Sequence, residues 1–335
     1  MRVKVIPIKE LSEDLKQRWL EIQSSNPNLS GPCFHPELFV SVGKFCPDVY
    51  VSLLHNGKDL CGFFPFRKDR GGLIAKAIEF CDYEAIISSP HQYWNVDEIL
   101  KKSGLSGWQF NSIVDFKNLK ITDGNYKIIL SLRADLTGGF EKYQTSLKNG
   151  RIKDRELSRQ LRVLQRTIGP IRYIPVCSDI EVLRQALTWK TIRHNRDTEW
   201  EKMALGLLEY IYCLEEPSFS GALSALYVGD NLLAANFGIR YQGIMHGWMI
   251  AFNPNFPKYS PGIILLHYLL AQLDSLQCGI LDFGRANSQY KHTLSNTSVP
   301  VMVGTVRTHT LKERIKPIHW IHRGIFYFVK TDNAN

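Results

Sequence analysis

Residues 247–295 read GWMIAFNPNFPKYSPGIILLHYLLAQLDSLQCGILDFGRANSQYKHTLS, and this stretch decides the fold. A strand over Ile244–Phe252 leads through a loop rich in Pro and Asn into an apolar helix over Pro261–Ser275. A second strand follows over Gly279–Phe283. A strand, a helix and a strand in this order favour a parallel pair joined by a crossover. We therefore expect an α/β or α+β protein with a mixed sheet.

The start of the expected helix has the features of an anion site. Ser260 is a suitable N-cap, Pro261 suits the first helical position because its missing N–H costs nothing there, and Gly262 has no Cβ. An anion can therefore approach the free backbone N–H groups, which makes this helix start a candidate phosphate site. A well-capped core helix without a ligand is the alternative.

The second strand ends in polar residues that directly follow this helix. Asp282-Phe283-Gly284 closes the strand, and Tyr290-Lys291 comes after a short polar loop. Open α/β sheets bind ligands at such strand ends, which makes Asp282 and Lys291 candidate site residues. The Asp-Phe-Gly triplet is not a kinase motif, because no Gly-rich loop, VAIK-like strand or HRD loop accompanies it.

Positive charge is concentrated in two segments. The chain has 41 Lys and Arg against 32 Asp and Glu, a net charge of +9, and the excess lies mainly in residues 148–172 and 307–330. In the first segment, arginines that include Arg155 and Arg159 recur three or four residues apart, opposite a leucine face with the same spacing. This pattern predicts an amphipathic helix whose arginine stripe suits a phosphate-bearing partner. A solvated face without a ligand is the alternative.

Two stretches about half the chain apart read as similar β-hairpins. Val49–Arg67 turns at Asn56-Gly57, and Leu223–Arg240 turns at Gly229-Asp230. A Leu, a small residue and an apolar strand follow both turns at matching positions. The match indicates a tandem duplication, with chance similarity of two common units as the alternative.

Length and composition limit the class of protein. With 335 residues, 44% of them hydrophobic and 22% charged, the chain is expected to form two globular domains that meet near residues 135–150. No apolar run reaches the length of a membrane span, and the N-terminus shows no secretory signal. Seven cysteines without a CxxC or a Cys/His metal spacing predict reduced thiols, a cytoplasmic protein and no metal site.

The YSPG helix start, the LDFG strand end and the Tyr-Lys pair resemble the GNAT acyltransferase domain of the branch named for CelD/BcsL, also called BioF2-like. This branch is related to the Fem-type peptidyl transferases. The resemblance implies tandem GNAT-like domains with mixed, largely antiparallel sheets flanked by helices. It implies a degenerate N-terminal domain over 1–140, an acyltransferase domain over 141–310 and a basic C-terminal tail over 311–335.

The resemblance also implies a coenzyme A site. In GNAT proteins the diphosphate of coenzyme A rests on backbone N–H groups at this helix start, which assigns Tyr259, Ser260, Pro261 and Gly262 to the donor site. The usual pattern there is Gln/Arg-x-x-Gly-x-Gly/Ala. When it is aligned with this chain, its two glycine positions fall at Ser260 and Gly262, and its Gln/Arg position falls at Pro257, so the chain departs from the pattern. The resembling branch and the Fem group, which uses aminoacyl-tRNA, share this departure. Acetyl-CoA is the expected cosubstrate, and no permanently bound cofactor is expected.

Acyl transfer needs a base, donors for the developing oxyanion and an acid for the leaving group. Lys291 matches a lysine that Fem-type enzymes keep for charge stabilisation. Asp282 is a candidate base or orienting group, and Tyr290 is a candidate proton donor to a leaving thiolate. The alternatives are a surface lysine, a strand-end cap and a packed tyrosine.

His246 lies on the strand before the expected phosphate loop, in phase with Ile250. Histidine titrates near neutral pH, which suits it to general base work, and a hydrogen-bonded core histidine is the alternative. Arg285 is a candidate contact for an anionic group of donor or acceptor, as are Arg155 and Arg159 on the arginine stripe.

We therefore expect an acyltransferase that carries an acetyl group to an amino sugar, a nucleotide sugar or a related precursor of the cell envelope or of an exopolysaccharide. The protein is expected in the cytoplasm or at the inner face of the membrane. One alternative is a Fem-like transfer from aminoacyl-tRNA, and the other is a non-catalytic GNAT-like subunit of a polysaccharide assembly machine. The basic tail interleaves aromatic residues with cations, which suits contact with membrane phospholipid. A helix packed on its own domain is the alternative for the tail.

Overall fold

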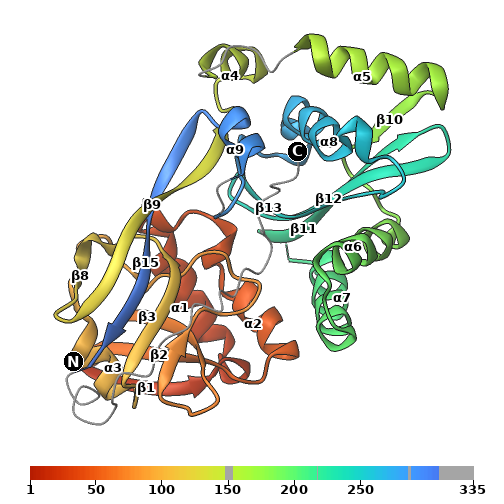
Figure 1. The fold of residues 1–335 in the computed structure, drawn as a ribbon. Coiled ribbons are helices and arrows are strands. Elements are labelled where there is room, and N and C mark those ends of the chain that lie inside the picture. The colour runs from red at the N-terminus through yellow and green to blue at the C-terminus, as the bar shows by residue number, and fades with distance from the viewer. Residues whose placement is uncertain (148–153, 217, 286–287, 309–335) are drawn as a thin grey trace. The chain divides into compact units, whose positions relative to one another are not determined.

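The computed structural model describes residues 1–147, 154–216, 218–285 and 288–308 (Figure 1). The basic tail over 311–335 lies outside the described residues. In the described part, no helix is both long enough and apolar enough to span a lipid bilayer.

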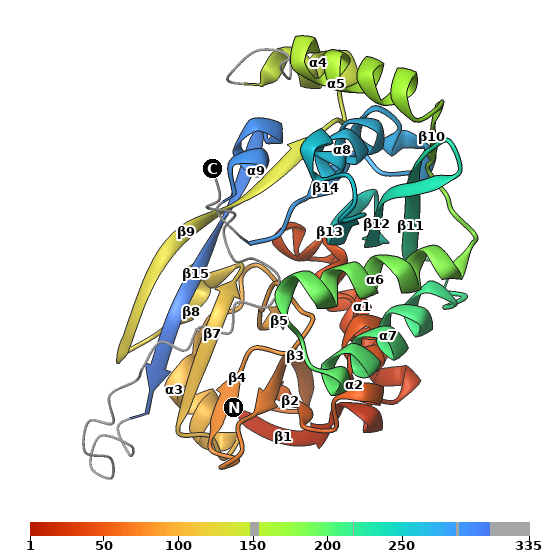
Figure 2. The ribbon, with the colours of Figure 1, turned by 45° about the vertical axis from the view of Figure 1, so that its right-hand side comes forward.

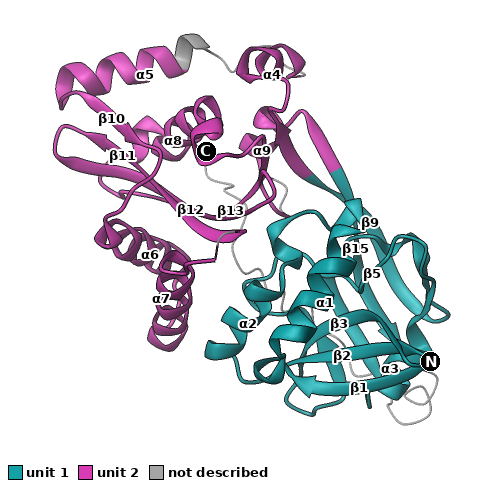
Figure 3. Cartoon of the chain, turned by 180° about the vertical axis from the view of Figure 1, so that it is seen from behind, with its two compact units in different colours: residues 1–131, 299–330 teal, residues 132–298, 331–335 magenta. Residues whose placement is uncertain are grey.

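The chain folds into two compact units, which Figure 3 colours separately. Unit 1 contains residues 1–131 and the strand residues from Val299 onward, and unit 2 contains residues 132–298. Strands β9 (Gly124–Asp135) and β15 (Thr297–Arg307) each pass from one unit into the other. Each unit is built on a mixed sheet flanked by helices, which confirms the expected fold class.

Unit 1 is a sheet with the strand order β1-β2-β3-β4-β7-β15, in which only β4 and β7 run parallel. Its elements are β1 (Arg2–Pro7), α1 (Glu13–Ser24), α2 (Pro36–Phe45), β2 (Val49–Asn56), β3 (Asp59–Lys68), β4 (Ile74–Lys76), β5 (Ile87–Ser88), β6 (Trp94–Asn95), α3 (Val96–Lys102), β7 (Gly107–Ile113) and β8 (Leu119–Lys120). The short β5 pairs with β3, and β6 pairs with β8 in a small separate sheet. Trp19 of α1 is fully buried against Phe39 and Phe63, and its indole N–H donates to the Phe34 carbonyl.

Unit 2 has the strand order β9-β14-β13-β12-β11-β10, where β9 contributes its last residues. Its further elements are α4 (Phe140–Ser146), α5 (Asp154–Thr167), β10 (Ile171–Ile174), α6 (Ile180–His194), α7 (Thr198–Tyr212), β11 (Phe219–Val228), β12 (Asn231–Tyr241), β13 (Ile244–Phe252), α8 (Pro261–Ala271), β14 (Ile280–Asp282) and α9 (Gln289–Leu294). The β13–β14 pair is parallel and all its neighbours are antiparallel, so the predicted crossover is confirmed.

Helices cover both faces of the unit 2 sheet. Helices α6 and α7 pack on one face, and α8 packs on the other against β11, β12 and β13 (Figures 1 and 2). Helix α8 is almost entirely apolar, and its leucines form the centre of a core to which α5 adds Leu157 and Leu164. The arginines Arg159 and Arg162 on α5 are exposed, which confirms the predicted amphipathic helix.

The two units repeat one plan. A strand, two helices and a hairpin follow one another in both, as β1-α1-α2-β2-β3 and as β10-α6-α7-β11-β12. Gly57 and Gly229 open the two hairpin turns with φ of 62° and 55°, a conformation that favours glycine. Both hairpins also have a register shift at the same distance before that glycine, at Leu54/His55 and at Leu226/Tyr227. The shared irregularity supports a duplication more strongly than the hairpin sequences do, because chance would not repeat it.

Candidate active site

The candidate site lies where β13 and β14 of unit 2 part. The two strands pair over three positions that end with His246 opposite Asp282. Strand β14 stops there, whereas β13 continues to Phe252. Beyond Gly247 the backbone of β13 therefore has no β14 partner, and there the Ile250 carbonyl accepts a 3.4 Å bond from the Lys190 ammonium.

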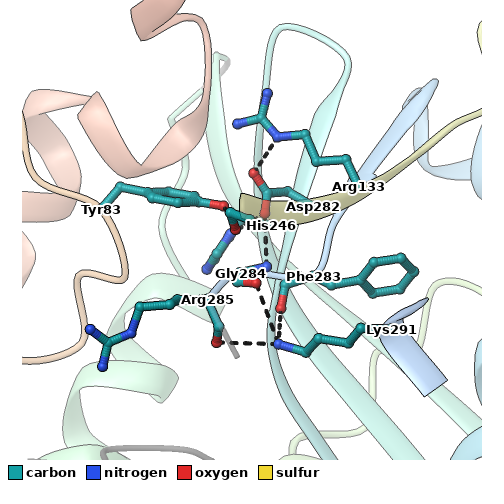
Figure 4. A network of polar contacts seen from close by, with 9 residues as sticks. Tyr83, Arg133, His246, Asp282, Phe283, Gly284, Arg285 and Lys291 are labelled. Atoms are coloured by element: carbon teal, nitrogen blue, oxygen red, sulfur yellow. Dashed lines mark hydrogen bonds and ion pairs between the residues drawn. The ribbon is translucent and has the colours of Figure 1, made fainter. Parts of the chain in front are cut away.

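Asp282 is the centre of a buried polar group at this point (Figure 4). Its Oδ2 accepts a 2.7 Å bond from the Arg133 Nε of β9, and its Oδ1 accepts a 2.8 Å bond from the Gly284 N–H. The His246 Nδ1 lies 3.6 Å from the same Oδ1. Asp282 is 2% exposed and His246 is 1% exposed, so a charged carboxylate needs support here, and Arg133 and the amide provide it.

Lys291 is also buried, with 4% of its surface exposed, so the alternative of a surface lysine is wrong. Its ammonium donates to the carbonyls of Phe283 at 2.5 Å, Arg285 at 3.3 Å and Gly284 at 3.4 Å. These carbonyls belong to the segment that directly follows Asp282, as Figure 4 shows. Lys291 therefore fixes the chain beyond β14 and brings a positive charge to the strand end.

Helix α9, which holds Lys291, is itself anchored. The Tyr143 hydroxyl of α4 donates a 2.6 Å bond to the Leu294 carbonyl at the end of α9. Burial raises the pKa of Tyr143, which keeps the hydroxyl protonated and able to donate. Tyr290 is half-buried, and its ring packs edge-on against Phe283. The ring of Tyr290 is thus packed, and its role as a proton donor stays a prediction.

The start of α8 differs from the expectation. Ser260 precedes the helix in the left-handed conformation, with φ of 50°, and its side chain makes no capping bond. The physical reason is the 3₁₀ turn Pro257–Tyr259, which places Ser260 at its C-cap. The prediction that Ser260 is the side-chain N-cap of this helix is therefore wrong.

The 3₁₀ turn also uses amide groups that were expected to bind a diphosphate. The Tyr259 N–H donates to the Phe256 carbonyl, and the Ser260 N–H donates to the Pro257 carbonyl, both at 3.2 Å. Pro261 has no N–H to offer. Among the described residues of this turn, Gly262 therefore has the amide that bonds no backbone carbonyl. A cradle built mainly of backbone amides is thus not present at this helix start.

The remaining predicted residues are spread over unit 2. Figure 4 shows the Arg285 side chain pointing away from Lys291, with its guanidinium outside the polar group around Asp282. Arg159 of α5 lines a cavity together with Lys258 and Tyr259. Arg155 lies in α5, but its side chain is outside the described residues. In the described ranges, no three His, Cys, Asp or Glu side chains lie close enough together to hold a metal ion.

Arg133, whose Nε bonds the Asp282 carboxylate at 2.7 Å, was not among the predicted site residues. It lies on β9, and its separation of 149 positions from Asp282 in the sequence hides the pairing. The available signal was indirect, since a buried aspartate at a strand end requires a cation or several donors.

Residues 152–292 match the family described as acetyltransferase (GNAT) domain, which covers most of unit 2. A comparison with curated protein sequences finds no match. The match confirms the prediction of an acyltransferase of the GNAT type. The finer assignment to the CelD/BcsL branch stays a prediction.

Several solved structures share the fold of nearly the whole chain. The crystal structure of FemX has a TM-score of 0.58 and 9% identity, and the alignment covers 94% of this chain and 100% of that chain. An acetyltransferase from the GNAT family of Colwellia psychrerythraea has a TM-score of 0.53 and 15% identity, with coverage of 92% and 100%. The C-terminal domain of a protein assigned as a lysylphosphatidylglycerol synthetase, from Agrobacterium fabrum, has a TM-score of 0.51 and 12% identity, with coverage of 87% and 92%. At these identities the likeness shows the fold alone.

Proposed function

We propose that the chain transfers an acyl group, acetyl by default, from acyl-CoA to the amine of an amino sugar or a related precursor of the cell envelope or of an exopolysaccharide. The observation that carries the proposal is the opening between β13 and β14, with His246 and Asp282 paired at its start and Lys291 just beyond. A buried imidazole next to a buried carboxylate, beside the part of β13 that β14 does not pair, suits acyl transfer to an amine.

In this proposal His246 is the general base and Asp282 orients it. The Nδ1 of His246 faces the carboxylate, and Nε2 is the nitrogen that we propose takes a proton from the attacking amine. The amine nitrogen forms a bond to the thioester carbonyl carbon, and the C–S bond then breaks to release the thiolate. Tyr290 is the candidate donor of the proton that the thiolate takes up.

Lys291 acts through its charge and not as a direct hydrogen-bond donor to substrate. Its three carbonyl partners occupy the donors of the ammonium, so it holds the strand end in place and supplies a fixed positive potential. The partner of the developing oxyanion is then expected among the N–H groups of β13 beyond Gly247, where β14 no longer pairs with it.

The part of β13 that β14 does not pair also suits the donor. The pantetheine arm of an acyl-CoA carries amide groups, and an extended amide chain adds to a free strand edge by backbone hydrogen bonds. The Arg285 guanidinium, which lies outside the buried group, is proposed to contact an anionic part of the acceptor.

The conformation at the start of α8 keeps aminoacyl-tRNA as a second candidate for the acyl donor. The loss of available amides over Tyr259 and Ser260 weakens the usual reason to favour coenzyme A, and aminoacyl-tRNA is the alternative donor. The net charge of +9 is compatible with it.

The test is a binding and rate experiment on the full chain. We expect calorimetry with coenzyme A to give one site per chain, and acetyl transfer to a panel of amino sugars to release thiol. His246→Gln should lower the rate by at least ~100-fold and leave coenzyme A binding unchanged, because a base acts in the chemical step. Tight binding of aminoacyl-tRNA with no binding of coenzyme A would replace the proposed donor.

We further propose that the reaction takes place in the cytoplasm or at the inner face of the membrane, where an envelope precursor is available. Support comes from the basic and aromatic sequence of residues 311–335. Flotation with vesicles containing anionic phospholipid, with and without residues 312–335, tests this point. If both proteins float equally, the tail is not the contact.

A further inference from the structure

A basic cavity lies in unit 2 away from the group around Asp282. It is formed by α5 and the 3₁₀ turn before α8, it has a volume of about 280 Å³, and it is lined by Arg159, Gln160, Val163, Lys258 and Tyr259. Two of these five residues are cationic and none is acidic. A concave site with two cations and no acidic residue in its lining is suited to an anion.

The two cations come from different elements that the core holds together. Helix α5 is fixed by Leu157 and Leu164, which are buried in the same core as α8, so Arg159 is presented from a packed helix. Lys258 belongs to the turn Pro257–Tyr259 that leads into α8, and its ammonium lies 4.9 Å from the centroid of the Tyr259 ring. The ring limits the positions of the ammonium and offers an apolar surface beside it.

The cations of the cavity can replace the backbone N–H groups that the 3₁₀ turn uses for its own hydrogen bonds. The amides of Tyr259 and Ser260 bond carbonyls of their own turn, so backbone N–H groups contribute little to anion binding at this helix start. Side chains have to supply the positive charge instead. Arg159 offers a planar fork that fits two phosphate oxygens, and Lys258 offers a compact point charge.

We propose that this cavity binds a phosphate group at the nucleotide end of the acyl donor, through Arg159 and Lys258, with Gln160 as a neutral hydrogen-bonding group and Tyr259 as a stacking surface. The assignment rests on the proposed function, in that the donor is an acyl-CoA. Arg159 is thereby assigned to the acyl donor, whereas the arginine stripe had suggested a contact with the acceptor. The volume accommodates a phosphate and part of its ribose or base, but not the pantetheine arm, which follows β13.

The test measures binding by calorimetry to the full chain with three probes: coenzyme A, pantetheine, which has no phosphate, and inorganic pyrophosphate. The variants are Arg159→Gln, Lys258→Gln and their combination. We expect each single change to weaken coenzyme A binding roughly 10-fold and the pair to weaken it on the order of 100-fold, because each removes one charge-assisted contact to phosphate. Pantetheine binding should not change.

Arg162→Gln is the matched control. Arg162 lies on the same helix and is exposed, its Nε donates to the Ser158 carbonyl of its own helix, and it does not line the cavity. It loses the same charge, so a non-specific effect of net charge would appear in it equally. Melting temperatures of all variants verify that the fold is kept.

The outcomes separate this inference from the proposed function. If the double variant binds coenzyme A as the unchanged protein does, the cavity assignment is overturned and the function stands. If the unchanged protein binds pyrophosphate but not coenzyme A, and the double variant binds neither, the cavity is a phosphate site and the proposed donor is wrong. If the unchanged protein binds neither probe, both are overturned.

Discussion

Replacing Arg133 with Met should destabilise unit 2, because it leaves the Asp282 carboxylate buried without its cation. The Arg133 side chain is 15% exposed and that of Asp282 is 2% exposed, and the Nε–Oδ2 distance is 2.7 Å. Removing one member of a buried ion pair costs about 3–5 kcal/mol. The Gly284 N–H still supports the other carboxylate oxygen, which places the expected loss at the lower end, ~3 kcal/mol.

The design is a double-mutant cycle with Asp282→Asn. The amide that replaces the carboxylate is not charged, so the variant that carries both changes has no unpaired buried charge. We therefore expect it to be more stable than the sum of the single changes predicts, by roughly 2 kcal/mol. Scanning calorimetry should show a decrease of roughly 6–12 °C in the unfolding temperature of unit 2 for the Arg133→Met variant, at about 2–4 °C per kcal/mol for a unit of this size.

The matched control is Arg172→Met on β10, the edge strand of unit 2, where Arg172 is exposed. Arg172 lies over the Tyr227 ring at 4.6 Å and forms a cation–π contact at the surface, so its loss should cost less than ~1 kcal/mol. If Arg133→Met is as mild as this control, or if the two changes in the cycle are additive, the carboxylate of Asp282 does not depend on Arg133 and the reasoning is refuted.

Three further changes follow from backbone geometry and from burial. A Cβ at Gly238 would lie 2.6 Å from the His246 carbonyl oxygen, so Gly238→Ala should cost about 1–3 kcal/mol and slow acyl transfer by shifting β13. Gly247→Ala, whose Cβ would lie 3.5 Å from the nearest atom, is the control and should keep its melting temperature. Ser260→Gly should raise the stability by roughly 0.5 kcal/mol, because relief of left-handed strain, about 1–2 kcal/mol, exceeds the entropy cost of glycine; a lower melting temperature would contradict this. Burial, and then the charge of Lys16, lower the pKa of His35 from 6.5 to about 3, so the unfolded chain takes up a proton between these values that the folded chain does not. The contribution of His35 to the free energy of unfolding should be fully present above pH 6.5 and should fall by up to ~1.4 kcal/mol per pH unit on acidification. The variant His35→Asn keeps a cap on the Glu37 N–H, so in urea titrations at several pH values it should remove this part of the pH dependence.

The parts of the fold that could be predicted are those whose signal is local. The hairpins follow from their turn glycines, and α8 and β14 follow from a long apolar run bounded by Ser-Pro-Gly and by Asp-Phe-Gly. The prediction failed at Ser260, where Ser before Pro resembles an N-cap. The preceding 3₁₀ turn decides the conformation there instead, and that turn depends on how the loop packs.

Contacts between distant segments were beyond the sequence. Asp282 and Lys291 were named because they stand near a strand end, but the identity of their partners required the structure. Strand β9 brings Arg133 to Asp282, and three backbone carbonyls, which no sequence pattern marks, hold Lys291. Strand β15 was also missed, since its Val and Met positions lead into the basic segment, which dominated the interpretation of that region.

The repeat of the plan explains why the proposed chemistry belongs to unit 2 alone. Unit 1 also has a parallel pair, β4 with β7. Its last paired position holds Lys76 opposite Gln109, where unit 2 has His246, the proposed base, opposite Asp282. The helix between the pair, α3, starts with Asn95, whose side chain accepts from the Glu98 N–H, and its first turn carries two acidic residues. A capped helix start with negative charge disfavours an anion, whereas the first turn of α8 has no acidic residue and Lys258 lies in the turn that precedes it. The duplicated scaffold thus kept its strand pairing in both units, and the features that suit an anionic donor and a proton acceptor occur together in unit 2.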